Sequence, residues 1–107
     1  MHLYYEQRSD GGSRFYRMSW QESIPESGSL AWLVRLRWGF VGQAGQQRKL
    51  WFSYREEALR KILHLHRLRL RQGYERLHRP TAEQSRFEFL FAEGTEQLDL
   101  FLPRSAA

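Results

Sequence analysis

The clearest pattern in the chain is an alternation of apolar and other positions across residues 32–40. The even-numbered positions hold Trp, Val, Leu, Trp and Phe, whereas Arg35 and Arg37 fall on the odd positions together with Leu33. A period of two is typical of a β-strand that buries one face. The segment therefore predicts a half-buried strand whose even-numbered side chains face a core.

Three further segments are expected to form strands with it. Residues 3–7 and 14–20 are separated by small turn-forming residues, Ser-Asp-Gly-Gly-Ser, which favour a hairpin. Residues 21–29 contain proline, glycine and three serines and predict a solvated loop. After the central strand, three glycines in seven residues indicate a turn, and residues 47–52 are expected to return as a fourth strand.

A helix is expected to follow the fourth strand. Ser53 and Glu56 have the spacing of a capping box, which predicts a helix start at about Tyr54. Gly73 suits the left-handed residue that ends a helix. The apolar side of the helical wheel carries Ala58, Leu59, Ile62, Leu63, His66 and Leu70, and the opposite side carries Arg60, His64, Arg67 and Arg71.

These elements predict an α+β fold, in which a small twisted antiparallel sheet of about four strands packs against one long α-helix. A chain of 107 residues supports one domain of this kind and leaves little room for a catalytic domain. Pro80 marks the exit into a linker, which divides the chain into a domain of residues 1–79 and a tail of residues 80–107. Apolar segments at 86–92 and 97–102 predict that the tail is either extended or a β-hairpin.

Charge is distributed unevenly between these two parts. Residues 1–81 carry 15 Lys and Arg against 7 Asp and Glu, a net charge of +8, and residues 82–107 carry 2 against 5, a net charge of −3. A basic body attracts polyanions because binding releases their condensed counterions. Nucleic acid is therefore the natural partner class, with a membrane surface or simple solubility as alternatives.

Several other classes of function have no support in the sequence. No apolar run is long enough to span a bilayer, and the first residues lack a signal-type segment, so we expect a cytoplasmic, nucleoid-associated protein without a membrane partner. The absence of cysteine excludes disulfides and thiolate zinc sites. His64 and His66 point about 200° apart on a helix, which prevents joint ligation of one metal ion. We expect no enzyme activity, no cofactor and no metal.

The glycine turn carries a recognisable motif. Residues 38–46 read Trp-Gly-Phe-Val-Gly-Gln-Ala-Gly-Gln, which resembles the signature of the WGR family, with Phe40 in place of the arginine that names it. The step at residues 12–16 and the Arg-Gln-Gly-Tyr sequence at residues 71–74 resemble further parts of these domains, in the family's order. The resemblance covers about residues 2–75.

The resemblance implies a compact α+β module of the kind found in DNA-damage proteins, where it binds nucleic acid, often at duplex ends or breaks. The family arginine touches the nucleic acid or a neighbouring domain. The basic residues around the glycine turn are expected to contact phosphates, and the alternative is a solvated basic face. The family tryptophan, Trp38 here, lies at the edge that faces nucleic acid, and the alternative for it is a role in the core. The candidate DNA-binding residues are Arg14, Arg35, Arg37, Trp38, Gly39, Arg48 and Lys49.

The tail contains a second motif, formed by Gln97, Leu98, Asp99, Leu100 and Phe101. This pentapeptide resembles the motif with which bacterial polymerases and repair factors bind the sliding clamp. Such a peptide docks in extended form and fills an apolar pocket with its last two side chains.

Two functions are compatible with these patterns. The first is a non-catalytic bacterial DNA-binding adaptor in repair or replication, which docks on the sliding clamp and contacts other repair or polymerase subunits. The second is a protein-interaction module with a structural hairpin in its tail and only weak, electrostatic DNA binding.

Overall fold

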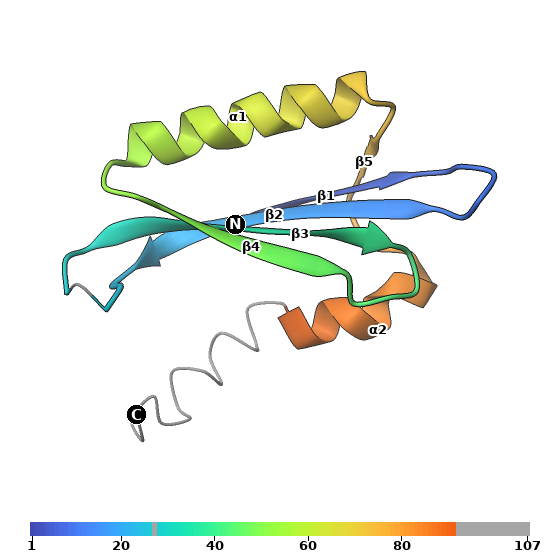
Figure 1. Ribbon diagram of the computed structural model, residues 1–107, viewed down its shortest axis with the longest axis horizontal. Helices are drawn as coiled ribbons and strands as arrows, with labels where there is room; N and C mark the ends of the chain where they lie inside the picture. The colour runs from blue at the N-terminus through green and yellow to red at the C-terminus, as the bar shows by residue number, and fades with distance from the viewer. Residues whose placement is uncertain (27, 92–107) are drawn as a thin grey trace.

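The computed structural model describes residues 1–26 and 28–91. They form a five-stranded antiparallel sheet with one helix on each of its faces (Figure 1). The strand order is β4-β3-β2-β1-β5. The elements are β1 (His2–Gln7), β2 (Arg14–Ser23), β3 (Ala31–Phe40), β4 (Gln46–Phe52), α1 (Arg55–Arg71), β5 (Glu75–Leu77) and α2 (Ala82–Phe91).

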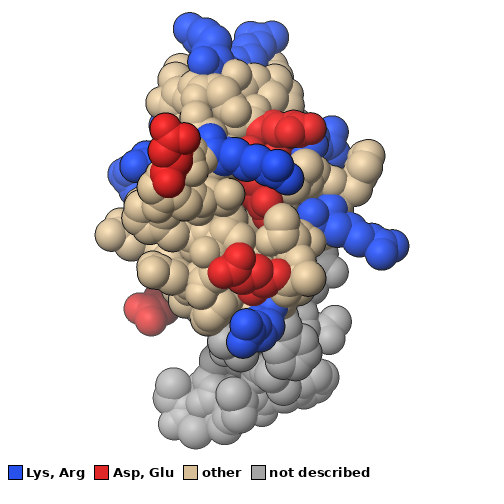
Figure 2. Space-filling model, turned by 90° about the vertical axis from the view of Figure 1, so that its right-hand side faces the viewer, with Lys and Arg blue, Asp and Glu red and all other residues tan. Residues whose placement is uncertain are grey.

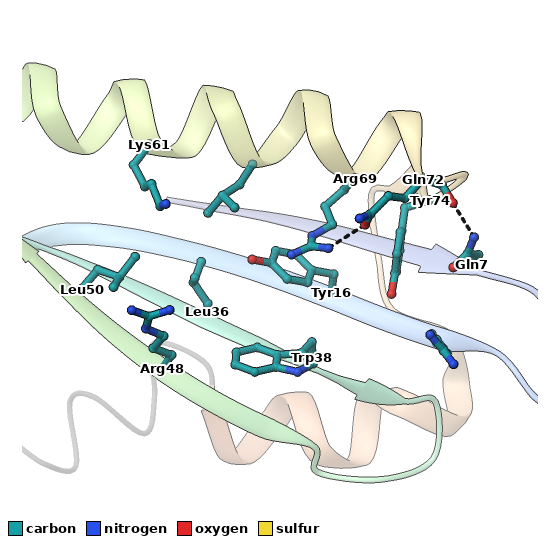
Figure 3. A pocket seen from close by; sticks show the side chains of 12 residues that line it. Gln7, Tyr16, Leu36, Trp38, Arg48, Leu50, Lys61, Arg69, Gln72 and Tyr74 are labelled. Carbon is teal, nitrogen blue, oxygen red and sulfur yellow. Dashed lines mark hydrogen bonds between the residues drawn. The ribbon is translucent and has the colours of Figure 1, made fainter.

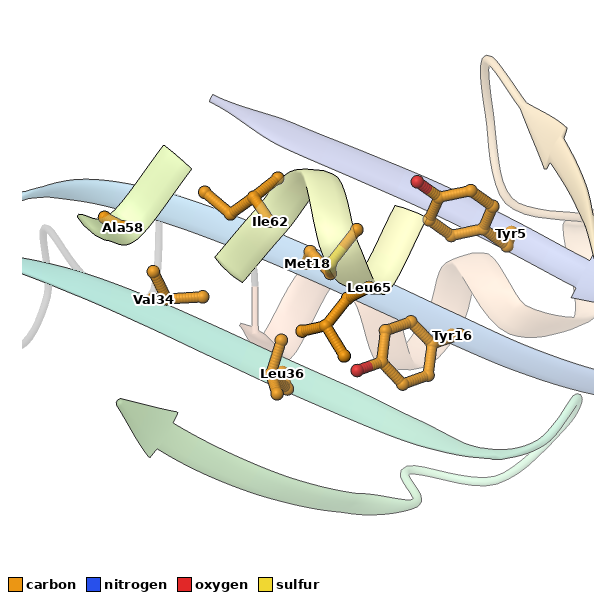
Figure 4. Close-up of a cluster of buried hydrophobic side chains, with 8 residues drawn as sticks. All are labelled: Tyr5, Tyr16, Met18, Val34, Leu36, Ala58, Ile62 and Leu65. Atoms are coloured by element: carbon orange, nitrogen blue, oxygen red, sulfur yellow. The ribbon is translucent and has the colours of Figure 1, made fainter. Parts of the chain in front are cut away.

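The face of the sheet that packs against α1 holds the main core (Figure 4). Val34 and Leu36 of β3 are 0% and 5% exposed, and Met18 of β2 is 0% exposed. The helix contributes Ala58, Ile62 and Leu65, while Tyr5 and Tyr16 complete the buried cluster. The alternation predicted for residues 32–40 is confirmed, because its even-numbered side chains from 32 to 38 belong to this cluster or pack against it.

The start of α1 differs from the prediction. The N-cap residue is Tyr54, and it makes no side-chain capping hydrogen bond. The expected capping box at Ser53 is therefore wrong, since Ser53 precedes the N-cap. Glu56 still lies in the first turn together with Glu57, where carboxylates interact favourably with the helix dipole.

The buried stripe of α1 is narrower than the helical wheel predicts. Leu65 is 7% exposed although it was not expected in the core, whereas Leu63 and Leu70 are 46% and 45% exposed. The buried residues follow the spacing i, i+4, i+7, which is one side of a helix. A helix that lies on a sheet buries only this stripe, so apolar residues at its border stay exposed.

The sheet has one strand more than predicted. Residues 75–77 form β5 and pair antiparallel with β1, with Tyr4 opposite Leu77. This short strand shows no alternation in its sequence, Glu-Arg-Leu. It forms because Gly73, at φ +93°, reverses the chain after α1 and brings it beside β1.

The tail begins as a helix, which corrects the prediction of an extended tail or hairpin for residues 82–91. Helix α2 covers the face of the sheet opposite α1 (Figure 1). The hydroxyl of Thr81 accepts a hydrogen bond from the backbone N–H of Gln84 at 3.4 Å, which caps the first turn. The clamp-like motif at positions 97–101 lies outside the described residues. Neither helix in the described part of the chain is long and apolar enough to cross a membrane.

Tyr5 joins the core to the inner side of α1. Its ring is fully buried, and its hydroxyl lies 2.6 Å from Nδ1 of His66. Desolvation by burial raises the pKa of Tyr5 from 10.0 to about 12 and outweighs the lowering effect of Arg76. Folding therefore favours the neutral phenol.

We expect this preference to appear in the dependence of stability on pH. The raised pKa means that the stability due to neutral Tyr5 is complete below pH 10 and is lost as the pH rises to about 12. In urea titrations the free energy of unfolding should fall more steeply over this range in the wild type than in Tyr5→Phe. Tyr54→Phe is the control, since Tyr54 is 67% exposed, and it should keep the steep fall. Parallel curves for the wild type and Tyr5→Phe would contradict the assignment.

Candidate nucleic-acid interface

A cavity of about 570 Å³ opens between α1 and the strands β2, β3 and β4 (Figure 3). We call it the basic groove. Four cationic side chains line it: Arg14, Arg48, Lys61 and Arg69. Three aromatic rings line it as well: Tyr16, Trp38 and Tyr74. None of the described residues in its walls is acidic, so the groove presents positive charge beside ring faces.

Cations and rings are stacked on one another inside this groove. The guanidinium of Arg69 lies 4.0 Å from the centroid of the Tyr16 ring. The Tyr16 ring is itself stacked with that of Trp38, at 6.4 Å between centroids and 25° between planes. Arg69 also donates a hydrogen bond to the side-chain oxygen of Gln72 at 2.6 Å. These contacts hold the rings and the charge in fixed positions, which lowers the cost of ordering them on binding.

The turn between β3 and β4 adjoins the groove. Gly45 has φ +78°, and a side chain on it would overlap the carbonyl oxygen of Trp38 and lie 2.9 Å from Cζ of Phe15. A Cβ on Gly39 would lie 2.9 Å from Cα of Gly45, so the two arms of the turn approach as closely as backbones allow. The glycines of the motif therefore shape the backbone, which sets the position of Trp38.

Side chains from the opposite face of the sheet hold the same turn. Arg37 donates from Nη1 to the carbonyl of Ala44 at 2.8 Å, and its guanidinium lies 4.9 Å from the centroid of the Phe15 ring. Gln84 of α2, which is 0% exposed, accepts from the backbone N–H of Gly42 at 2.8 Å. Its amide nitrogen donates to the carbonyl of Gln43 at 3.1 Å. The buried carboxamide of Gln84 therefore supplies hydrogen-bond partners for backbone groups of the turn that do not pair within the sheet.

The sequence-predicted site residues divide between the two faces of the sheet. Arg14, Trp38 and Arg48 line the basic groove, and Gly39 lines a second cavity beside it. The other three, Arg35, Arg37 and Lys49, have the opposite strand parity and lie on the face toward α2. Arg37 is only 4% exposed there.

Lys61, Arg69, Tyr74 and Gln84 were not among the predicted site residues. One sequence signal pointed to Arg69, because it falls on the wheel position shared by Ala58, Ile62 and Leu65, where a charge is unexpected. Gln84 had no such signal, since its role depends on where α2 docks.

Acidic and basic side chains are mixed at the end of the molecule that carries the β1–β2 and β3–β4 turns. Figure 2 looks at the side on the right of Figure 1, where the β1–β2 and β3–β4 turns lie, and it shows acidic side chains among the basic ones. The positive net charge therefore does not cover this end evenly. Among residues 1–26 and 28–91, no group of three or more His, Asp or Glu residues is placed to hold a metal ion.

Fold and groove together define a small α+β binding module with a cationic, aromatic-lined groove beside a glycine turn. Residues 1–81 match the model of the WGR domain, and the chain belongs to this family. WGR domains are nucleic-acid-binding modules associated with DNA repair. No curated protein and no solved structure matches the chain. Phe40 occupies the third position of the family motif.

The glycine turn yields a stability prediction. Gly45→Ala should lower the free energy of unfolding by about 1–3 kcal/mol, because alanine is strained at φ +78° and its Cβ overlaps the Trp38 carbonyl. The matched control is Gly11→Ala in the β1–β2 turn, where a Cβ has no atom within 4 Å. Thermal and urea unfolding of both variants measures the difference. Equal stability of the two variants would show that the close approach of β3 and β4 is not a constraint.

Proposed function

We propose that this protein is a non-catalytic DNA-binding adaptor in bacterial DNA repair or replication. It binds DNA ends, nicks or single strands through the basic groove and docks on the sliding clamp through residues 97–101. We place it in the cytoplasm, associated with the nucleoid. One observation carries the DNA-binding half: the groove combines four cations with the partly exposed rings of Trp38 and Tyr74, and its described walls hold no carboxylate.

The chemistry of the groove suits the two parts of a nucleotide. Arginine and lysine bind phosphate oxygens through charge-assisted hydrogen bonds, and each phosphate neutralised releases counterions. Aromatic faces stack on the faces of bases, which an intact duplex keeps covered by neighbouring base pairs. Ends, nicks and single strands expose these groups. The groove therefore favours interrupted DNA over a continuous duplex.

The selectivity is for DNA structure rather than sequence. Phosphate contacts carry no base information, and stacking on rings tolerates every base. Of the candidate residues, Arg14, Trp38, Gly39 and Arg48 contact DNA in this proposal. Arg37 instead positions the turn from the opposite face.

The remaining two candidates, Arg35 and Lys49, act differently in this proposal. They lie on the face toward α2, away from the groove, and add to the positive field that attracts DNA. Their effect should therefore depend on ionic strength rather than on the structure of the DNA.

The cations of the groove can be tested against those of the outer helix face. In Arg48→Gln with Lys61→Gln, the slope of log affinity against log salt should decrease by about 2 in magnitude, about 1 for each lost phosphate contact. Arg60→Gln with Arg67→Gln removes the same charge from exposed positions of α1 and should leave the slope nearly unchanged. Fluorescence anisotropy on blunt, nicked, single-stranded and covalently closed DNA at several salt concentrations gives both slopes.

Three results of this titration would count against the DNA-binding proposal. An equal loss in the control pair would mean that binding is generic electrostatics. Uniform binding to all four DNA forms that vanishes at moderate salt would have the same meaning. Absence of binding in the wild type would remove the proposal altogether.

The recruitment half depends on the pentapeptide outside the described residues. Leu100→Ala with Phe101→Ala should abolish binding to purified sliding clamp and leave DNA affinity unchanged, because apolar anchors contribute most of the binding energy of such motifs. Leu102→Ala, directly after the motif, is the control and should bind the clamp as the wild type does. Surface plasmon resonance measures all three proteins. Equal clamp affinity in the wild type and the double variant would remove the recruitment role.

A second candidate function, a protein-interaction module, has one observation in its favour. Ile24, Leu30 and Tyr54 are 67%, 61% and 67% exposed. The pairing of Ser23 with Ala31 and of Trp32 with Phe52 brings their segments together at the end of the sheet away from the glycine turn. Exposed apolar groups of this kind suit a protein partner. Such a surface is compatible with DNA binding at the opposite end.

A further inference from the structure

We propose that the second cavity, beside the glycine turn, binds one unpaired nucleobase, so that the protein prefers DNA ends with unpaired nucleotides over blunt ends. The proposal rests on the proposed DNA-binding function and adds a ligand for a distinct part of the surface. We call this cavity the turn pocket. Its volume is about 410 Å³.

The walls of the turn pocket are aromatic. Three rings line it, those of Trp38, Phe40 and Tyr74, and the guanidinium side chain of Arg14 lies among them. Arg14 pairs with Phe40 across β2 and β3, and its guanidinium carbon lies 5.4 Å from the centroid of the Phe40 ring. Phe40 is 44% exposed, so Arg14 covers its ring only in part and a large apolar surface remains in contact with water.

The floor of the pocket is bare backbone. Gly39 and Gly45 contribute no side chain there, and the close approach of the two residues excludes one. Gln43 and Gln46 add carboxamides to the lining. A carboxamide offers one acceptor and two donor hydrogens, which is the complement of the polar edge of a base. The pocket therefore combines ring faces, an open floor and polar groups.

These features select a base rather than a phosphate. A phosphate is bound best where several cations converge, and the turn pocket holds one cation, Arg14, among three aromatic rings and two carboxamides. The basic groove offers four cations, and it shares Arg14, Trp38 and Tyr74 with the turn pocket. One nucleotide can thus place its phosphate in the groove and its base against Phe40. Bases inside a duplex have both faces covered, and the terminal pair of a blunt end exposes only its outer face. An unpaired nucleotide is free to place its whole base among the rings of the turn pocket.

The backbone beside the turn pocket is also held by hydrogen bonds in the unbound protein. Arg37 and Gln84 hold the backbone of residues 42–44 by hydrogen bonds from the opposite face of the sheet. A preformed pocket loses little conformational entropy on binding, so stacking energy is retained as affinity.

The test uses hairpin DNAs that share one duplex and one open end. The first is blunt, the second carries one unpaired nucleotide at that end, and the third carries an abasic nucleotide there, with the same phosphates but no base. Anisotropy at fixed salt should show the full-length protein binding the unpaired-base hairpin about 5- to 150-fold more tightly than the abasic one. Overhangs of each polarity, 3′ and 5′, are compared with their own abasic control. Tighter binding of the unpaired base at either polarity supports the base pocket.

Two substitutions at Phe40 connect this preference to the ring. Phe40→Leu should remove the difference between the unpaired-base and abasic hairpins while keeping the affinity for the blunt hairpin. Phe40→Trp preserves a ring and should retain the difference. Thermal unfolding of both variants checks the fold, which the exposed position of Phe40 should leave intact.

Failure of this inference differs from failure of the proposed function. Equal affinity for the unpaired-base and abasic hairpins in the wild type would overturn the base pocket and leave DNA binding by the groove in place. A preference that survives in folded Phe40→Leu would overturn the role of Phe40. Absence of binding to any of the DNAs would overturn both proposals.

Discussion

The period of two along β3 is the constraint on which the rest of this molecule depends. Consecutive side chains of a strand point to opposite faces, and β3 has a helix on each side of it. Val34, Leu36 and Trp38 face α1 and the basic groove, whereas Arg37 lies between them in sequence and faces the other way. One strand therefore supplies both a wall of the basic groove and the arginine that holds the adjoining turn.

This arrangement explains why the glycine turn is so tightly defined. The turn must bring β4 back beside β3 while leaving the ring of Trp38 at the mouth of the groove. Backbone contact between Gly39 and Gly45 achieves the close return, and Phe15 fills the space beneath it. Arg37 and Gln84 then satisfy turn backbone groups that sheet pairing leaves over. Arg37 and Gln84, which are buried on the face toward α2, thus fix the position of a turn that adjoins the basic groove on the other face.

The electrostatic character of the protein is local rather than global. Acidic and basic side chains mix at the end that carries the turns (Figure 2), while the groove collects four cations without a carboxylate among its described walls. Cations that stack on rings keep their charge available to a ligand while their side chains are partly ordered. In the proposed function this local arrangement is the source of selectivity for particular DNA structures, whereas net charge alone attracts any polyanion.

By itself, the sequence determined the elements that local rules govern. Alternation identified β3 and its core face, the small residues identified the β1–β2 and β3–β4 turns, and the motif at residues 38–46 indicated the family. Only the tertiary structure decided which arginines line the groove. Strand parity separates Arg37 from Arg48, but the exposure of each depends on which helix covers which face.

The parts that the sequence did not show depend on contacts between distant segments. Strand β5 exists because β1 offers a free edge, and Gln84 is buried because α2 docks 42 residues after the turn it holds. Arg69 is a further example, because its position on the inner side of α1 is explained only by its contact with the Tyr16 ring of β2. Local sequence patterns record the propensities of neighbouring residues, whereas these features arise from packing across the sheet, which no local pattern contains.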